Sequence, residues 1–388
     1  MDDVDLGTTL RVTIASPSAV CRPSVALGPC IDHRGIVTEF SSSDSSVVSD
    51  DDCEVKTAWR PTAPDPGVWS LYRAGGMHRR PESPNDQKGS GVDFIAQLGD
   101  FVDGCNQDLP GGGRKALQEL LGPVDQGPPV LHLIGNHELY NFARKEMEDG
   151  IPLPGLKVPF RTSAPPALDA EAPSKTSSYY SFSPADGWRV CVLDPYEISI
   201  MSHGGGRPGV DEVTLEPGAV SWCQENNPND ITKEDFARGI PPGEARRWVP
   251  LNGAVSEQQL IWLEETLELA SKKNEETIIL SHVVLLPEAT PGQNGLTLLW
   301  NYDKVLQVLR SAERPPTAVL CGHAHLMVNS RDQVSGTHHV TLPTPVEANP
   351  GSDACAVVEA FSNGLLKIRG RGDVLSSTLA CSTHATCT

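Results

Sequence analysis

The 388-residue sequence lacks the features of a membrane protein or a nucleic acid binder. It contains no run of 18 apolar residues, which argues against a transmembrane helix. Its first ten residues, MDDVDLGTTL, have neither the basic start nor the apolar block of a signal peptide. Basic residues are few, 31 against 50 acidic ones, and the formal charge of −19 repels nucleic acid backbones and anionic lipid surfaces. We therefore expect a cytoplasmic protein that binds neither.

Paired cysteines, internal repeats and domain linkers are lacking as well. The ten cysteines include no CxxC pair and follow no regular spacing, and Cys191 and Cys321 lie within apolar runs. This pattern indicates reduced thiols rather than a disulfide framework. A chain of this length can bury the core of one large α/β domain without such cross-links.

Short apolar runs that end abruptly in polar residues are the main feature that is present. They occupy residues 92–100, 129–138, 188–194, 276–282 and 317–325. Runs of this kind, bounded by glycine or proline, predict buried strands. Helical patterns lie between them, the clearest at residues 256–273, where Ser256 and Gln259 form a capping box, and a second at 302–312. Alternating strands and helices predict a layered α/β core.

The chain outside these runs is rich in glycine and proline. We expect one domain over residues 45–375, with surface insertions at residues 151–175 and 203–253 beside the site, where substrate-selecting loops usually lie. Residues 1–44 show no sustained period and are expected to form an irregular segment, and residues 376–388 a tail.

Four of the five strand runs end in side chains that bind metals. These are Asp100 with Asp103, Asn136 with His137, His282, and His323 with His325. Open α/β sheets gather functional groups at the carboxyl ends of their strands. Each motif alone has a structural alternative, such as a core histidine or a turn asparagine. Together, carboxylates, imidazoles and an amide oxygen suit hydrolysis by two divalent ions, which acidify a bridging water into a nucleophile.

The motifs GDFVD, GNHE, a lone histidine and GHAH resemble the signature of the calcineurin-like metallophosphoesterases. Further segments between about residues 92 and 372, including LNGAVSEQQLIWLEETL and LLWNYDKVLQVLR, resemble the manganese-dependent ADP-ribose/CDP-alcohol diphosphatases. The resemblance implies a four-layer α-β-β-α sandwich with two central mixed sheets. It also implies a hydrolase that cleaves ADP-ribose or CDP-alcohols such as CDP-choline to a nucleoside monophosphate and a phosphorylated sugar or alcohol.

The resemblance further implies two divalent metal ions, Mn²⁺ first, with Mg²⁺, Zn²⁺ or Fe²⁺ as alternatives. Asp100 would bridge the two ions. One ion would be bound by Asn136, His282 and His323, and the other by His325.

The resemblance also implies an acid next to the metal ions. His137 would donate a proton to the leaving phosphate oxygen, and Asp103 would orient it. A carboxylate in this position favours the protonated form of an imidazole.

The first motif of the family, DxH or DxQ, is missing upstream of Asp100. In the segment VVSDDDCE, Val47 and Val48 predict a short strand that places Asp50 and Asp52 on the same face. Asp50 precedes Asp100 by 50 residues, about the separation seen in the family. The adjacent Asp-His pair in CIDHRG would point to opposite faces. We therefore predict Asp50 as a metal ligand, with Asp52 in place of the neutral Gln or His.

Aromatic and basic residues near these motifs are candidates for binding a small-molecule nucleotide diphosphate: Tyr140, Arg144, Tyr196, Trp300 and Tyr302. The rings would stack on the base, and Arg144 would contact a phosphate. The alternatives are that Trp300 and Tyr302 only pack the start of a helix, and that Arg144 lies on a solvated helix face.

Other activities within the same superfamily fit the same motifs. The chain could be a cyclic-nucleotide phosphodiesterase or a phosphomonoesterase. Because its first motif is aberrant, it could also be a weakly active relative that binds nucleotides with one metal ion. We expect a monomer.

Overall fold

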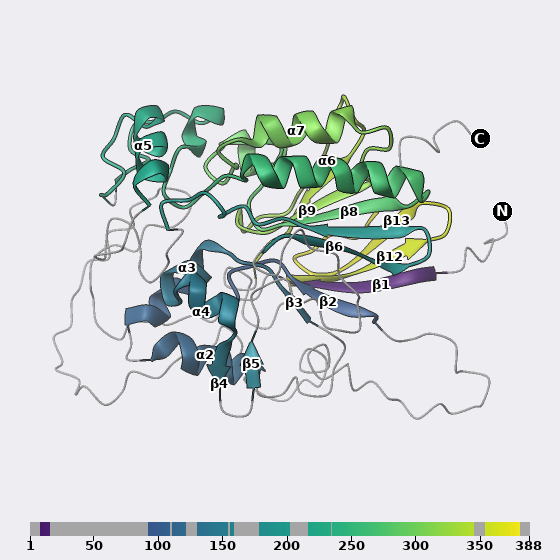
Figure 1. Ribbon diagram of the computed structural model, residues 1–388, viewed down its shortest axis with the longest axis horizontal. Helices are drawn as coiled ribbons and strands as arrows, with labels where there is room; N and C mark the ends of the chain where they lie inside the picture. The colour runs from purple at the N-terminus through teal and green to yellow at the C-terminus, as the bar shows by residue number, and fades with distance from the viewer. Residues whose placement is uncertain are drawn as a thin grey trace.

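Two mixed sheets form the centre of the molecule. The computed structural model describes residues 8–15, 92–108, 111–121, 130–153, 156–158, 178–201, 216–233, 235–344 and 354–380. Within these residues, two six-stranded sheets pack against each other, one group of helices covers the outer face of the second sheet, and another group lies beside the first (Figure 1). This arrangement confirms the predicted α/β sandwich.

The first sheet has the strand order β14-β13-β12-β1-β2-β3. Its strands are β1 (Thr8–Ala15), β2 (Phe94–Gln97), β3 (Val130–His132), β12 (Ala354–Phe361), β13 (Leu365–Gly372) and β14 (Ser377–Ala380). β1, β2 and β3 run parallel, and β12, β13 and β14 continue the sheet antiparallel to their neighbours. The carboxyl ends of β2 and β3 therefore meet at one edge.

The second sheet has the order β10-β11-β9-β8-β7-β6. Its strands are β6 (Tyr180–Ala185), β7 (Trp188–Val192), β8 (Glu276–Ser281), β9 (Ala318–Cys321), β10 (Val328–Arg331) and β11 (His338–Thr341). The four inner strands β7, β8, β9 and β11 are parallel, and the edge strands β6 and β10 are antiparallel. All five apolar runs of the sequence thus contain a strand, as predicted.

Helices cover the second sheet and occupy connections between the strands of both sheets. They are η2 (Gly104–Asp108), α2 (Gly112–Leu121), α3 (Asn136–Asn141), α4 (Arg144–Asp149), α5 (Pro217–Asn226), η4 (Glu244–Arg247), α6 (Glu257–Lys272), η5 (Pro287–Ala289), η6 (Pro291–Gln293) and α7 (Tyr302–Ser311). A hairpin of β4 (Ile151–Leu153) and β5 (Leu156–Val158) follows α4. α6 and α7 lie side by side over the second sheet (Figure 1). Half of the predicted capping box of α6 is present: Ser256 Oγ accepts a hydrogen bond of 3.1 Å from Gln259 N, but Ser256 N donates to Glu197 Oε2 instead of to Gln259.

The core between the sheets follows the two-residue period of the strands. Along β8, Ile278 and Leu280 belong to the cluster that joins the two sheets, whereas Ile279 belongs to the cluster beneath the helices. Phe94, the first residue of β2, and Leu98, just after its end, belong to the same inter-sheet cluster. Because both faces of these strands are buried, their sequences read as continuous apolar runs.

The prediction of an irregular segment over residues 1–44 was wrong for β1. This strand lies inside the first sheet, parallel to β2 and antiparallel to β12. Its residues Leu10, Val12 and Ile14 alternate and are buried in the inter-sheet core. The alternation covers only three positions, and the strand forms because it pairs with residues that lie 82 positions away in β2 and 340 to 353 positions away in β12. Likewise, the expected tail contains β14.

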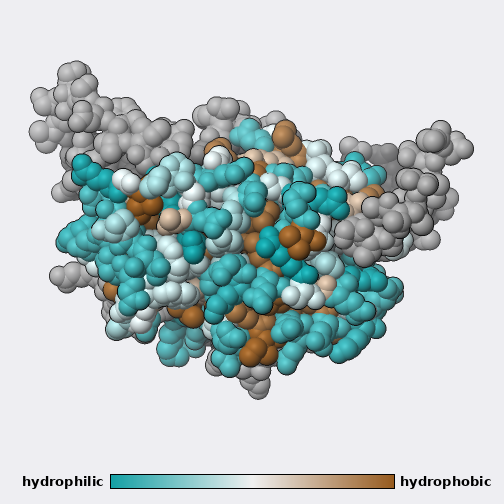
Figure 2. All heavy atoms as spheres, turned by 90° about the horizontal axis from the view of Figure 1, so that it is seen from above, coloured by the Kyte–Doolittle hydropathy of each residue, from teal (hydrophilic) through white to brown (hydrophobic). Residues whose placement is uncertain are grey.

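Hydrophobic side chains do not form a continuous band on the face seen from above. This face is mainly hydrophilic, with separate hydrophobic patches (Figure 2). Along the described residues, no helix is both long and apolar enough to cross a bilayer.

A buried histidine in β11 predicts that the protein loses stability in acid. His339 is 1% exposed, and within the described residues neither of its ring nitrogens has a hydrogen-bond partner. Burial lowers the pKa of His339 to about 3. Between pH 6.5 and this value the unfolded chain binds a proton that the folded protein does not, so stability falls as the pH falls. At pH 5 the loss should be about 2 kcal/mol.

The measurement is urea unfolding at pH 7.5 and pH 5.0. We expect His339→Leu to remove about 2 kcal/mol of the difference between the two pH values. His338→Leu, at the half-buried neighbouring position, is the control and should change the difference less. An unaltered pH difference in His339→Leu would contradict the prediction.

Candidate metal centre

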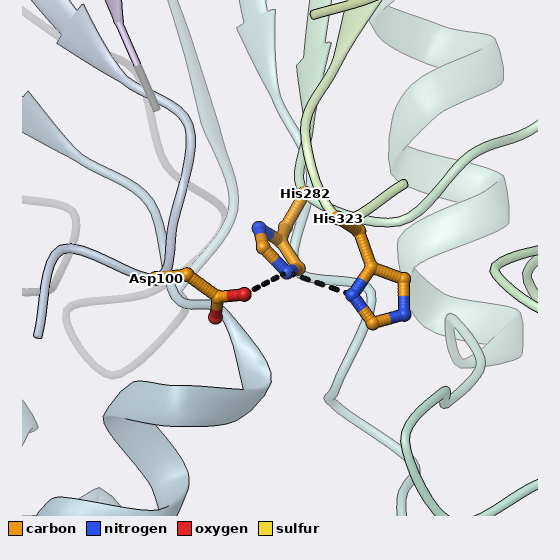
Figure 3. Close-up of side chains that lie close together, drawn as sticks. All are labelled: Asp100, His282 and His323. Carbon is orange, nitrogen blue, oxygen red and sulfur yellow. Dashed lines mark hydrogen bonds and ion pairs between the residues drawn. The ribbon is translucent and has the colours of Figure 1, made fainter. Parts of the chain in front are cut away.

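Three buried side chains from the two sheets converge on one point (Figure 3). Asp100 follows β2, His282 follows β8 and His323 follows β9. His282 Nε2 lies 3.3 Å from Asp100 Oδ2 and 3.2 Å from His323 Nδ1. All three donor atoms lie within 4.8 Å of one another. The strand ends therefore bring these predicted ligands together.

The second nitrogen of each histidine fixes which atom faces this point. His282 Nδ1 donates to Leu98 O at 2.7 Å, and His323 Nε2 donates to Asn252 Oδ1 at 2.9 Å. The proton of each neutral ring is therefore on its outer nitrogen, and the inner nitrogens carry lone pairs. Two lone pairs and a carboxylate directed at one another repel unless a cation lies between them. The donor set thus fits a divalent metal ion.

The protonation of these groups also indicates a site for positive charge. Burial alone would lower the pKa of His282, but the charge of Asp100 and the hydrogen bonds of the ring to Asp100 and to Leu98 O together outweigh it and raise this pKa above its usual value. Burial alone would raise the pKa of Asp100, yet the charges of His137 and His282 hold it well below its usual value. Without a cation the cluster attracts a proton, which a metal ion would replace.

Asn136 presents its amide oxygen to the same cluster. Asn136 Oδ1 lies 3.2 Å from His282 Nε2, and Asn136 Nδ2 donates to the hydroxyl of Tyr140 at 2.9 Å. The hydroxyl of Tyr196 shares its one proton between Leu251 O at 3.1 Å and Asn136 Oδ1 at 3.3 Å. These bonds orient the amide so that its oxygen faces the histidines. The geometry supports the prediction that Asn136 is a ligand.

The backbone at the centre is held in an unusual conformation. Asp100, His323 and His325 have φ values of 58°, 62° and 59°, in the left-handed region that such residues seldom adopt. Strain of this kind concentrates at functional sites. A Cβ atom on Gly135 would lie 2.2 Å from Asp100 Oδ1, so only glycine allows this close approach.

Glu138 holds the Asp100 loop, a role that the sequence did not reveal. Its buried carboxylate accepts four backbone hydrogen bonds, from the N–H groups of Gly135, Asp100, Phe101 and Val102, at 2.8, 2.7, 2.6 and 3.2 Å. Burial, and then the charge of Asp100, raises the pKa of Glu138 to about 7. Its position as the last letter of GNHE was the available signal.

His137 lies at the edge of the cluster, with its ring only partly buried. Its backbone N–H donates to Asp100 Oδ1 at 3.0 Å. Its Nδ1 accepts from Gly104 N at 3.1 Å and lies 3.7 Å from Asp103 Oδ1. In the neutral ring the proton is therefore on Nε2. Gly104 N–H makes the orienting hydrogen bond of the neutral ring, and the orienting role of Asp103 stays a prediction.

The three-residue cluster does not include His325, and two further predicted ligands cannot be placed. His325 is buried two residues after His323, and its role as a ligand of a second ion stays a prediction. Asp50 and Asp52 lie outside the described residues. β1 and β3 occupy both sides of β2, so the strand that precedes β2 in the chain and pairs with it is formed by residues 8–15.

The aromatic residues expected to stack on a base lie mostly inside the protein. Tyr140, Tyr196 and Trp300 are between 0% and 5% exposed. Trp300 packs against Trp222 and Trp248. Such burial leaves no ring face for a substrate, and the structure favours the packing alternative.

Tyr302 and Arg144 also make protein contacts. Tyr302 is the first residue of α7, and its ring is only partly buried. Its hydroxyl is hydrogen-bonded to Glu244, the first residue of η4. Arg144 forms a two-pronged ion pair with buried Asp194, at 2.8 and 3.3 Å, and donates to Tyr196 O at 2.8 Å. Its guanidinium therefore joins α4 to the end of β7, and the predicted phosphate contact stays a prediction.

Known proteins resemble the chain in sequence and in fold. Residues 78–327 match the calcineurin-like phosphoesterase family. A manganese-dependent ADP-ribose/CDP-alcohol diphosphatase of Arabidopsis thaliana is 33% identical over 276 residues, which cover 70% of this chain and 77% of the relative. The protein of the same name from Danio rerio is 32% identical over 295 residues, covering 75% and 84%.

Among solved structures, a dimetal phosphatase from Danio rerio has a TM-score of 0.67 and 24% identity, and covers 97% of this chain and 100% of that one. This likeness shows the shared fold. The family match and the sequence identities show more: the chain is a hydrolase of the calcineurin-like phosphoesterase family and belongs, within it, to the manganese-dependent ADP-ribose/CDP-alcohol diphosphatases.

Proposed function

We propose that the protein hydrolyses the diphosphate bond of ADP-ribose and of CDP-alcohols such as CDP-choline, with two divalent metal ions, Mn²⁺ foremost. The products are a nucleoside monophosphate and a phosphorylated sugar or alcohol. The observation that carries the proposal is the convergence of Asp100, His282 and His323 donor atoms within 4.8 Å, with Asn136 beside them. The names of the relatives support the substrate class.

The chemistry follows from the positions of the side chains. Bound divalent ions supply positive charge to the diphosphate oxygens and make a water acidic enough to attack phosphorus. Asp100, Asn136, His282 and His323 would hold an ion at the end of the strands. The water oxygen forms a bond to one phosphorus, and the bond from this phosphorus to the bridging oxygen breaks. His137, at the edge of the cluster, would act from its protonated form, with Nδ1–H facing Asp103 Oδ1, and would donate the Nε2 proton to the leaving phosphate oxygen, which returns the ring to its neutral form.

The proposal predicts which substrates the protein cleaves. Mn²⁺-loaded protein should release nucleoside monophosphate from ADP-ribose or CDP-choline faster than it cleaves 3′,5′-cyclic AMP or a generic phosphomonoester. The measurement is kcat/KM for the four substrates at one pH and one Mn²⁺ concentration. A higher kcat/KM for cyclic AMP or for the monoester would overturn the proposal in favour of another activity of the superfamily.

A second candidate function is nucleotide binding with a single metal ion. It is favoured by β1, because this strand ends at Ala15 and the next residues, Ser16, Pro17 and Ser18, include no carboxylate or imidazole. Metal analysis separates the two functions. Two ions per chain, one of them lost in Asp50→Asn, support the diphosphatase. One ion per chain, retained in Asp50→Asn, supports the one-metal relative.

A further inference from the structure

Asn252 lies in the loop before α6 and is fully buried next to His323, on the side of the metal centre that the second sheet provides. Its amide nitrogen donates two hydrogen bonds, to Arg247 O and to Leu296 O, both at 2.8 Å. Both partners are carbonyl oxygens, which only accept. The orientation of the amide is therefore fixed, and its oxygen must face the other way, toward His323.

We infer that Asn252 is the residue that positions His323 for metal binding, an inference that rests on the proposed metal site. Asn252 Oδ1 accepts a hydrogen bond from His323 Nε2–H at 2.9 Å. An oxygen that cannot donate keeps the proton on Nε2, so Nδ1 keeps its lone pair directed at Asp100 and His282. The bond also sets the plane of the ring. Partners of this kind raise the metal affinity of a histidine without touching the metal.

The same bonds connect the metal centre to the end of the 203–253 insertion. The guanidinium of Arg247 donates to Trp300 O at 2.8 Å and lies over the rings of Trp248 and Tyr302, 4.7 and 5.3 Å from their centroids. The carbonyl that orients Asn252 thus belongs to a residue held firmly against the start of α7. The position of His323 depends on how this end of the insertion packs.

The test compares two buried asparagines. Asn301 is also buried and also uses its side chain to bond the backbone, at Val255 N and Val255 O, and neither of these side-chain hydrogen bonds goes to a predicted metal ligand. Asn252→Leu and Asn301→Leu each remove buried amide hydrogen bonds from the same region. Mn²⁺ titration should show about 10- to 100-fold weaker binding of one ion in Asn252→Leu. Asn301→Leu should keep the wild-type affinity.

A measurement on the wild-type protein tests the inference without any variant. In metal-free protein above neutral pH, ¹⁵N chemical shifts of the histidine rings should show His323 protonated on Nε2 and not on Nδ1. The signal is assigned by its loss in His323→Asn. Protonation on Nδ1, or equal Mn²⁺ affinity in the two leucine variants, would overturn the inference.

These outcomes are distinct from failure of the proposed function. If the wild-type protein binds Mn²⁺ but cleaves no diphosphate, the substrate proposal fails, and weaker binding in Asn252→Leu would still support Asn252 as a positioning residue. If diphosphates are cleaved and Asn252→Leu binds both ions normally, the positioning role fails alone.

Discussion

Glu138→Gln is expected to remove high-affinity metal binding and to lower the free energy of unfolding by about 3 kcal/mol. Both oxygens of Glu138 accept backbone hydrogen bonds, each from two N–H groups. Glutamine has one accepting oxygen, and its NH₂ group would face two N–H donors. Each buried donor left without an acceptor costs about 1–3 kcal/mol. The Asp100 loop, which these bonds keep in its left-handed conformation, would move away from the histidines.

Glu276 provides the matched control. It is also buried, and it accepts from Arg314 at 3.0 Å and from Thr317 at 2.9 Å, in the second sheet. Glu276→Gln should lower stability without changing metal binding. Urea unfolding and Mn²⁺ titration, at a temperature where both variants are folded, separate the two effects. Wild-type Mn²⁺ affinity in folded Glu138→Gln would show that the carboxylate does not hold Asp100 in place.

Three of the predicted metal ligands could be selected from the sequence because each follows a short apolar run that predicts a buried strand. Asp100, His282 and His323 come directly after buried apolar runs, and parallel strands deliver their ends to the same edge. The pattern of each run is contained in fewer than ten residues. The rule places His282 and His323 at one edge of the second sheet, whereas the meeting of Asp100 with them depends on how the first sheet packs against the second.

The groups that orient the ligands depend on contacts that sequence does not display. Glu138 bonds to residues 36 to 38 positions earlier in the chain, and Asn252 bonds to His323, 71 positions later. A buried asparagine in a loop looks the same whether it caps a turn or holds a ligand. These roles follow only from the assembled fold.

The main contacts of Arg144 and of β1 are also distant in sequence, and local patterns did not reveal them. Arg144 was a candidate phosphate contact because it follows the GNHE motif, but its charge is matched by Asp194, 50 residues away. β1 was missed because three alternating apolar residues make a weak signal, and its pairing with β12 spans most of the chain. In both cases the decisive energy comes from a partner distant in sequence.

His137→Asn is expected to lower kcat for diphosphate cleavage by roughly 10²- to 10⁴-fold and to leave metal binding unchanged. The asparagine oxygen can occupy the place of Nδ1 and accept from Gly104 N–H, so the loop keeps its hydrogen bond. The bond from the backbone N–H of residue 137 to Asp100 Oδ1 is also retained. What disappears is Nε2–H, the group that donates to the leaving oxygen.

A series of nucleoside 5′-aryl phosphates with leaving groups of graded basicity tests this role. In the wild-type enzyme kcat should depend weakly on the leaving group, because protonation compensates for its basicity. In His137→Asn the dependence should be steep, with the largest loss for the most basic leaving group. Asp103→Asn, which removes a charge 3.7 Å from Nδ1 but keeps the proton donor, should lose less. A uniform loss of kcat across the series would contradict proton donation by His137 and would leave binding or orientation of the substrate as its contribution.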